Sequence, residues 1–262
     1  MYDSTPSASP AFEVTRRYPA GRRKILALLD DASYTESYDQ TVCITPESVA
    51  NVRFPLTADG DSVVVGAVLN RVMGRADRPE TGIVLFIGDD HTLAVIPPFP
   101  VEADRVLQGT NGTPLLSILD RQLVIGVILL RLGRYAVGVL DNNKLVASKT
   151  GSRYVKNRHR AGGSSQHRFE RSRERLVREL FDAGCKVAGD VFGQVEGRLD
   201  YLLTGGERHT LDAFIKRCDL MQRHSTITLA RTLEVARPGQ AALERIHNEV
   251  WKSRVIELER VR

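Results

Sequence analysis

The residues best suited to chemistry lie in one short segment, Gly162-Gly163-Ser164-Ser165-Gln166. Paired glycines accept backbone angles that other residues avoid and, having no Cβ, let the chain approach a ligand closely. Ser164 or Ser165 can cap a following helix, which would place Gln166 in the first turn beside the positive end of the helix dipole. A glutamine amide is no general base at neutral pH, so its plausible task is to position a reacting molecule through hydrogen bonds.

The cations around this segment form a sharp local concentration of charge. Between Lys149 and Arg178 ten lysines and arginines are opposed only by Glu170 and Glu174. Such a run is typical of a nucleic-acid contact, because a polyanion relieves its self-repulsion. The residues predicted to contact RNA are Arg153, Lys156, Arg158, His159, Arg160, His167, Arg168 and Arg171. Two alternatives stay open: a solvated helix face with ion pairs, and a plain Gly-Ser linker.

The elements that must position these residues follow an α/β pattern with two domains. We predict a flexible leader over 1–20, an N-terminal α/β domain of unclear role over 21–119, and a second domain of mixed sheet and interleaved helices over 120–262. In the first domain, a helix is expected at 24–29, extended segments at 41–44 and 50–56, and a hairpin over 82–96. Residues 62–73 are ambiguous between strand and helix, and their length and apolar spacing favour a helix. In the second, strands are expected at 123–132, 134–140, 144–148, 186–192, 199–203 and 225–235, with helices at 165–183, 211–216 and from Pro238 to about Leu258. Gly184 is expected to end the first of these helices.

Composition excludes several classes of protein. Cys43, Cys185 and Cys218 are scattered, without a CxxC pair, which favours buried thiols in a reducing compartment over a disulfide framework or a zinc site. The N-terminus lacks the apolar stretch of a signal peptide, and the longest apolar run, Leu123–Leu130, is far below the roughly 20 residues that span a bilayer. We therefore expect a cytoplasmic protein with no membrane contact. Asp89-Asp90-His91 fits a hairpin turn better than a metal site, and no motif indicates a metal or a cofactor.

From Leu123 to Arg262 the chain resembles the catalytic domain of archaeal and eukaryotic peptide-chain release factors. Within that superfamily it is most similar to the VLRF branch, the release-factor-like peptidyl-tRNA hydrolases of ribosome quality control. The resemblance is carried, in order, by YAVGVLDNNKLVAS (135–148), YVKNRHR (154–160), GGSSQ (162–166), HRFERSRERLVREL (167–180) and CKVAGDVFGQVEGRLDYLLTGG (185–206). The usual loop of the superfamily is Gly-Gly-Gln, whereas two serines here separate the glycines from Gln166, a GxxQ spacing like that of the VLRF branch. The N-terminal half carries neither the NIKS nor the YxCxxxF pattern by which termination factors read stop codons.

The resemblance implies a fold, a site and a substrate. Gln166 would carry the catalytic role, with Gly162 and Gly163 shaping the loop and Ser164 and Ser165 completing it. The substrate would be peptidyl-tRNA stalled on the large ribosomal subunit, hydrolysed without codon recognition by a monomer that needs no cofactor. The peptidyl transferase centre and the ribose hydroxyl of the tRNA would supply the remaining chemistry. The chain also ends with the catalytic domain, so no domain that recruits a partner GTPase is expected.

Two other functions stay open at this point. His159 and His167 flank the loop, and paired imidazoles can act as acid and base in cutting RNA near the tRNA 3′ end. Alternatively, the chain binds tRNA or the ribosome without catalysis.

Overall fold

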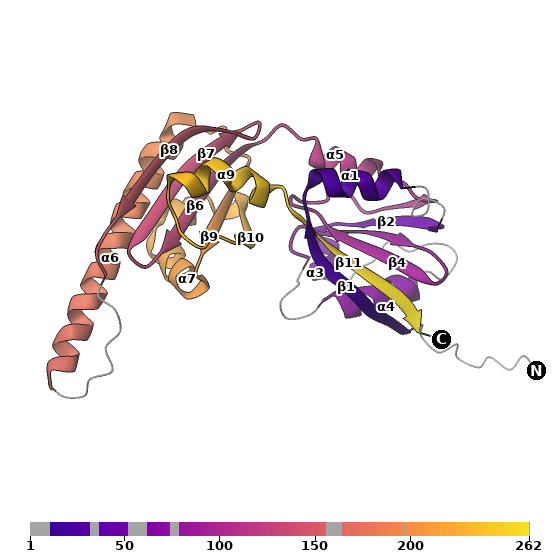
Figure 1. Cartoon of the computed structure of the whole chain (residues 1–262), viewed down its shortest axis with the longest axis horizontal. Helices are drawn as coiled ribbons and strands as arrows, with labels where there is room; N and C mark the ends of the chain where they lie inside the picture. Colours follow the sequence, from indigo (N-terminus) through magenta and orange to yellow (C-terminus); the bar gives the residue numbers. More distant parts are fainter. Residues whose placement is uncertain are drawn as a thin grey trace, which may run out of the picture. The chain divides into compact units, whose positions relative to one another are not determined.

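The computed structural model describes residues 11–31, 37–51, 62–73, 79–155, 164–195 and 197–261. The chain forms two compact units, one of residues 1–121 with 251–262 and the other of residues 122–250. Both contain a sheet and helices (Figure 1), so the α/β fold class predicted from the sequence is confirmed.

The sheet of the first unit has the strand order β1-β11-β4-β3-β2-β5, and its neighbouring strands pair antiparallel. The strands are β1 (Ala11–Ala20), β2 (Gln40–Ile44), β3 (Ile83–Ile87), β4 (His91–Ile96), β5 (Arg105–Gln108) and β11 (Ser253–Val261). The predicted hairpin is the β3–β4 pair, with Asp89 and Asp90 in its turn.

Helices cover both faces of this sheet because alternate strand residues are apolar on each side. On one face, Val65, Leu69 and Val72 of α4 (Ser62–Val72) share a core with the strands and with Val49 of α3 (Pro46–Ala50). On the other face lie α1 (Arg22–Asp30) and α5 (Thr113–Leu119), as Figure 1 shows. The predicted helices at 24–29 and 62–73 are confirmed as α1 and α4.

Both ends of the described chain differ from the prediction. Residues 11–20, expected in a flexible leader, form β1, which pairs with β11 from Ala11 opposite Val261 to Ala20 opposite Ser253. The predicted terminal helix ends at Val250 as α9 (Gln240–Val250), and the chain continues as strand β11. Val255, Ile256 and Leu258 are buried, as fits a strand that lies between β1 and β4. Residues 1–10 of the leader and 52–56 of an expected extended segment lie outside the described residues.

The second unit has a mixed sheet with the strand order β10-β9-β6-β7-β8. Its strands are β6 (Val124–Arg131), β7 (Arg134–Asp141), β8 (Lys144–Ser152), β9 (Tyr201–Gly206) and β10 (Thr228–Leu233). The β6–β7 and β7–β8 pairs are antiparallel, whereas β9 is parallel to both β6 and β10. The three consecutive strands predicted before the glycine segment are therefore present, and the segment follows the edge strand β8.

Helices again lie on both faces of the sheet. Helices α6 (Ser164–Phe192), α7 (Arg208–Arg217) and α8 (Asp219–Arg223) contribute Leu180, Phe214 and Leu220 to a core with alternate residues of β6 and β7. Gly138 of β7 approaches Leu243 of α9, which places α9 on the opposite face (Figure 1).

Gly184 does not end the helix, and residues 186–192 are not a strand. Helix α6 includes all of these residues and is 29 residues long in total. A Cβ added at Gly184 would lie 3.6 Å from the Phe214 ring and 3.8 Å from Tyr135, so the glycine lies where α6 passes close to α7 and β7. Buried Val187, Ala188 and Val191 follow at helical spacing and continue the same packed stripe.

Candidate functional site

The candidate site follows β8, the edge strand of the sheet in the second unit. Among the described strands, β8 pairs with β7 alone. The two are joined by Asn142 and Asn143, whose φ angles of 48° and 67° belong to a tight hairpin turn. This confirms the turn predicted at Asp141-Asn142-Asn143. After β8, the Arg153 amide still donates to the Gly133 carbonyl at 3.0 Å, and Val155 packs against the core of the unit. Residues 153–155 are therefore held against the second unit.

Tyr154 lies between these two held residues and is 76% exposed. It is one of few large apolar side chains on the described surface, and exposed Arg153 precedes it. An exposed ring beside cations is a suitable surface for stacking a nucleobase. Tyr154 is not among the predicted RNA contacts, which were chosen by charge. The signal that could have found it is an aromatic residue beside a basic run.

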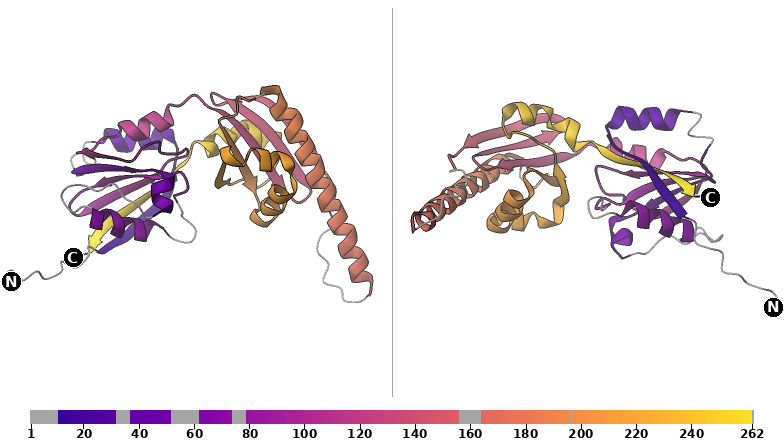
Figure 2. Two further views of the ribbon diagram at one scale, coloured as in Figure 1. Left: turned by 180° about the vertical axis from the view of Figure 1, so that it is seen from behind. Right: turned by 60° about the horizontal axis from the view of Figure 1, so that its bottom comes forward.

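Helix α6 begins at Ser164, so Ser164, Ser165, Gln166 and His167 form its first turn, close to the predicted start at Ser165. From Gln166 to Leu180 the helix rises by about 21 Å. None of the described side chains between 168 and 179 is buried, and Leu180 is the first that is. Figures 1 and 2 show this half of α6 continuing past the end of the strands of its own sheet. We call residues 164–179 the arm.

The arm is basic along its length. Arg168, Arg171, Arg175 and Arg178 are all exposed. An intrahelical ion pair joins Arg175 to Glu179 at 2.7 Å, as the solvated-face alternative expected. Exposed pairs of this kind contribute little to stability, and they leave most of the positive charge of the arm facing solvent.

The rest of α6, residues 180–192, packs against the sheet, and we call it the anchored half. Leu180, Phe181, Ala188, Val191 and Phe192 are buried in the core of the second unit. Lys149 of β8 also lies 3.7 Å from the Asp190 carboxylate. The arm therefore extends from a helix whose other half is fixed to the sheet.

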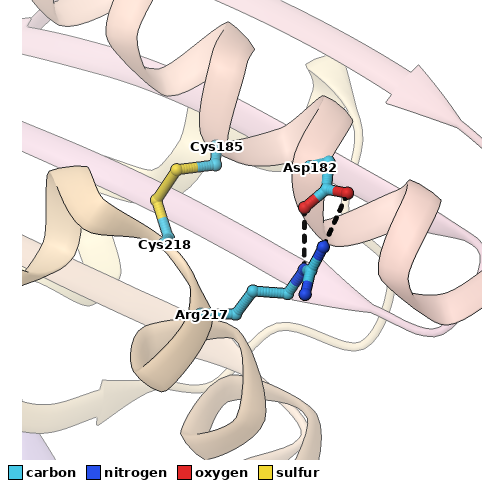
Figure 3. Close-up of polar contacts among 4 residues, drawn as sticks. All are labelled: Asp182, Cys185, Arg217 and Cys218. Carbon is cyan, nitrogen blue, oxygen red and sulfur yellow. Dashed lines mark hydrogen bonds and ion pairs between the residues drawn. A yellow bond between two sulfur atoms is a disulfide. The ribbon is translucent and has the colours of Figure 1, made fainter.

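Two further ties join α6 to the end of α7 (Figure 3). Arg217 donates to both oxygens of Asp182, at 2.7 and 2.9 Å, and Cys185 forms a disulfide with Cys218. The hydrogen bonds from Arg217, aided by the nearby charge of Arg178, lower the pKa of Asp182. The expectation that the cysteines form no disulfide is thus wrong. The fold brings the two Cα atoms within 5.6 Å, a proximity that residues 33 apart in sequence do not reveal.

The structure places only part of the predicted site. Arg153, Arg168 and Arg171 are described and exposed, on the approach from β8 and on the arm. Ser164, Ser165, Gln166 and His167 are placed by their helical backbone alone. The remaining predicted residues lie outside the described residues: Lys156, Arg158, His159, Arg160, Gly162 and Gly163. The roles assigned to all of these residues stay predictions.

Within the described ranges, no three His, Cys, Asp or Glu side chains gather in a way that could hold a metal ion. None of the described helices is both long and apolar enough to span a bilayer.

Comparison with known proteins adds a family match. The model of the Actinobacteria/chloroflexi VLRF1 release factor matches residues 124–256, from the first residue of β6 into β11. This match covers just over half of the 262 residues, including the arm and its anchored half.

Curated relatives are peptide chain release factor subunits 1. The protein of Pyrobaculum aerophilum is 24% identical over 213 residues, which are 77% of this chain and 54% of that protein. The protein of Archaeoglobus fulgidus is 26% identical over 175 residues, or 63% of this chain and 43% of that protein. The chain thus spans about half the length of these relatives.

Solved structures give a weaker likeness. The crystal structure of the archaeal translation termination factor aRF1 superposes with a TM-score of 0.38 at 17% identity, covering 86% of this chain and 68% of that one. Archaeoglobus fulgidus Pelota gives a TM-score of 0.28 at 10% identity, covering 89% and 64%.

Proposed function

The chain belongs to the Actinobacteria/Chloroflexi VLRF1 release factor family, and from this we propose that it hydrolyses peptidyl-tRNA on stalled ribosomal complexes. Hydrolysis would be independent of a codon and would take place at the peptidyl transferase centre of the large subunit. One structural observation carries the proposal: Gln166 lies in the first turn of a cationic arm, about 21 Å along the helix from its first buried residue. An arm of this kind can reach into a cleft of RNA that the rest of the domain cannot enter.

The ester between peptide and tRNA needs a water placed in line and a stabilised alkoxide. The amide of Gln166 donates and accepts hydrogen bonds, so it would orient that water together with the backbone of the Gly162-Gly163 loop. The arginines predicted to grip phosphates are Arg158, Arg160 and Arg168, with Arg171 next along the arm. Exposed Tyr154 would stack on a base where the chain leaves β8.

The test replaces Gln166 with alanine and measures peptide release from purified large subunits that carry peptidyl-tRNA. We expect the rate to fall by about 100-fold, the loss typical of a mispositioned reactant. Gln194→Ala is the matched control, because Gln194 is an exposed glutamine just beyond the other end of α6. Release that continues at the wild-type rate in Gln166→Ala would refute the proposal.

The same reaction separates ester hydrolysis from cutting of the tRNA. We expect the 3′ ends of the released tRNA to keep an intact CCA sequence. Ends that are shortened in the wild type and intact in a His159→Ala and His167→Ala double variant would favour an endonuclease instead.

A further inference from the structure

The Cys185–Cys218 disulfide joins two segments that already share an ion pair. Asp182 and Cys185 lie three residues apart on one face of α6, while Arg217 and Cys218 are consecutive at the end of α7. Figure 3 shows the two ties side by side. They hold α6 at the start of its anchored half, just beyond the arm. The covalent link, unlike the ion pair, can be opened by reaction with a thiol.

The disulfide also borders a surface cavity of about 400 Å³ between α6 and α8. Both cysteines line the cavity, and Cys185, which is half-buried, is the more accessible residue, since Cys218 is only 2% exposed. The wall of the cavity carries Lys186, Arg217, Arg223, Asp182 and Asp219. Since Arg217 and Asp182 neutralise each other, Lys186 and Arg223 outweigh Asp219.

We propose that this disulfide is a site of thiol–disulfide exchange that takes a small thiol bearing carboxylates, and that exchange releases one of the two ties on α6. Where protein disulfides occur in a reducing compartment, they are usually redox-sensing rather than structural. The inference concerns how α6 is held and stands whether or not the arm hydrolyses an ester.

The exchange proceeds in two steps. A thiolate attacks the Sγ atom of Cys185, a new S–S bond forms there, and the bond to Cys218 breaks with its electron pair leaving on the Cys218 sulfur, which takes a proton from solvent. A second thiolate then attacks the small thiol's sulfur and frees Cys185 as a thiolate, which is also protonated. Two small thiols are thereby oxidised to one disulfide while the protein disulfide is reduced to two thiols. The positive charge of Lys186 and Arg223 attracts an anionic attacker and stabilises the leaving thiolate.

The first test follows the chemistry in the full chain purified without reductant. Glutathione, which is anionic, and cysteamine, which is cationic, are compared at equal thiolate concentration and low salt, and the products are mapped by mass spectrometry. We expect glutathione to form an adduct on Cys185 at least about five times faster than cysteamine does. The double variant Lys186→Gln, Arg223→Gln keeps the disulfide and should bring the two rates together.

Four results would overturn the proposal. These are equal rates for the two thiols in the wild type, a preference for glutathione that survives in the double variant, an adduct on Cys218 instead, and a disulfide that opens only in denaturant. Cys43 is the internal control. It is buried, and its burial raises its pKa to about 11, so it should stay unmodified until the protein unfolds.

The second test follows the helix. On reduction, amide hydrogens of 182–192 should exchange about tenfold faster, and the thermal midpoint of the second unit should fall by on the order of 10 °C. Amides of β2 and β3, in the other unit, serve as the reference and should not change. Exchange in 182–192 that is the same in both redox states would show that the disulfide does not restrain α6.

Discussion

Tyr154 is the described side chain whose exposure most needs an explanation. Its neighbours Arg153 and Val155 are held by a hydrogen bond and by core contacts, so the ring faces solvent from a fixed backbone. If it stacks on a base, Tyr154→Ala should raise KM for the stalled complex by about tenfold and leave kcat within twofold. Tyr154→Phe should behave as wild type, because stacking needs the ring and not the hydroxyl.

The control for Tyr154 is Val146→Ala, which also removes an exposed apolar side chain. Val146 lies on β8, the strand that precedes Tyr154, and has no role in the proposal. The measurement is peptide release at several concentrations of stalled complex. An unchanged KM for Tyr154→Ala would leave this exposed ring without a role in binding.

Gly206 is a residue whose backbone allows no substitution. Its φ is 133°, and a Cβ there would lie 2.0 Å from the Leu130 carbonyl oxygen of the paired strand β6. Neither the positive φ nor the contact with the Leu130 carbonyl can be relieved by moving a side chain. Gly206→Ala should therefore destabilise the second unit by about 2–4 kcal/mol. Gly193→Ala is the matched control, as no atom lies within 4 Å of a Cβ at that position. Urea denaturation of both variants measures the difference, and equal midpoints would contradict it.

At the scale of elements, the exposed arginines of the α6 arm are expected to bind tRNA phosphates. Arg168→Glu with Arg171→Glu should weaken tRNA binding at least about tenfold and lower the slope of log affinity against log salt by about one per arginine. The expectation follows from the exposure of both side chains on the arm. Arg245→Glu on α9 is the control, because this exposed arginine lies on the helix that covers the opposite face of the sheet. An equal loss in Arg245→Glu would mean that net charge, and not the arm, governs binding.

The sequence predicted the elements around the arm better than the arm's own extent. The strands before it were found because their apolar runs are separated by turn residues, and the start of the helix because serines precede an apolar stripe. The end was misplaced because Gly184 looked like a cap, when in fact it lies where α6 passes Phe214 and Tyr135. Close packing between distant segments leaves no signal in a single sequence, and the same reason hides the pairing of Cys185 with Cys218.

At the scale of the molecule, the chain crosses between its two units twice. Residues 122–250 form the second unit, and β11 then joins the first, where it lies between β1 and β4. The sequence predicted a boundary near residue 120 from a turn-rich stretch, but it assigned 251–262 to the second domain. The residues of a strand do not show whether it joins the sheet of the second unit or pairs with β1 in the first. The choice of partner depends on contacts between residues that are far apart in the sequence.

Substituting two isoleucines tests whether β11 belongs to the first unit and α9 to the second. Ile246 of α9 and Ile256 of β11 are ten residues apart and each is 2% exposed, yet they belong to different units. Each substitution by alanine should cost about 2–5 kcal/mol through lost burial and the cavity left behind. Hydrogen exchange should therefore accelerate in β1 and β4 for Ile256→Ala, and in β7 and β8 for Ile246→Ala. If Ile256→Ala instead loosened β7 and β8, the last strand would belong with the second unit, and β1 would need a different partner.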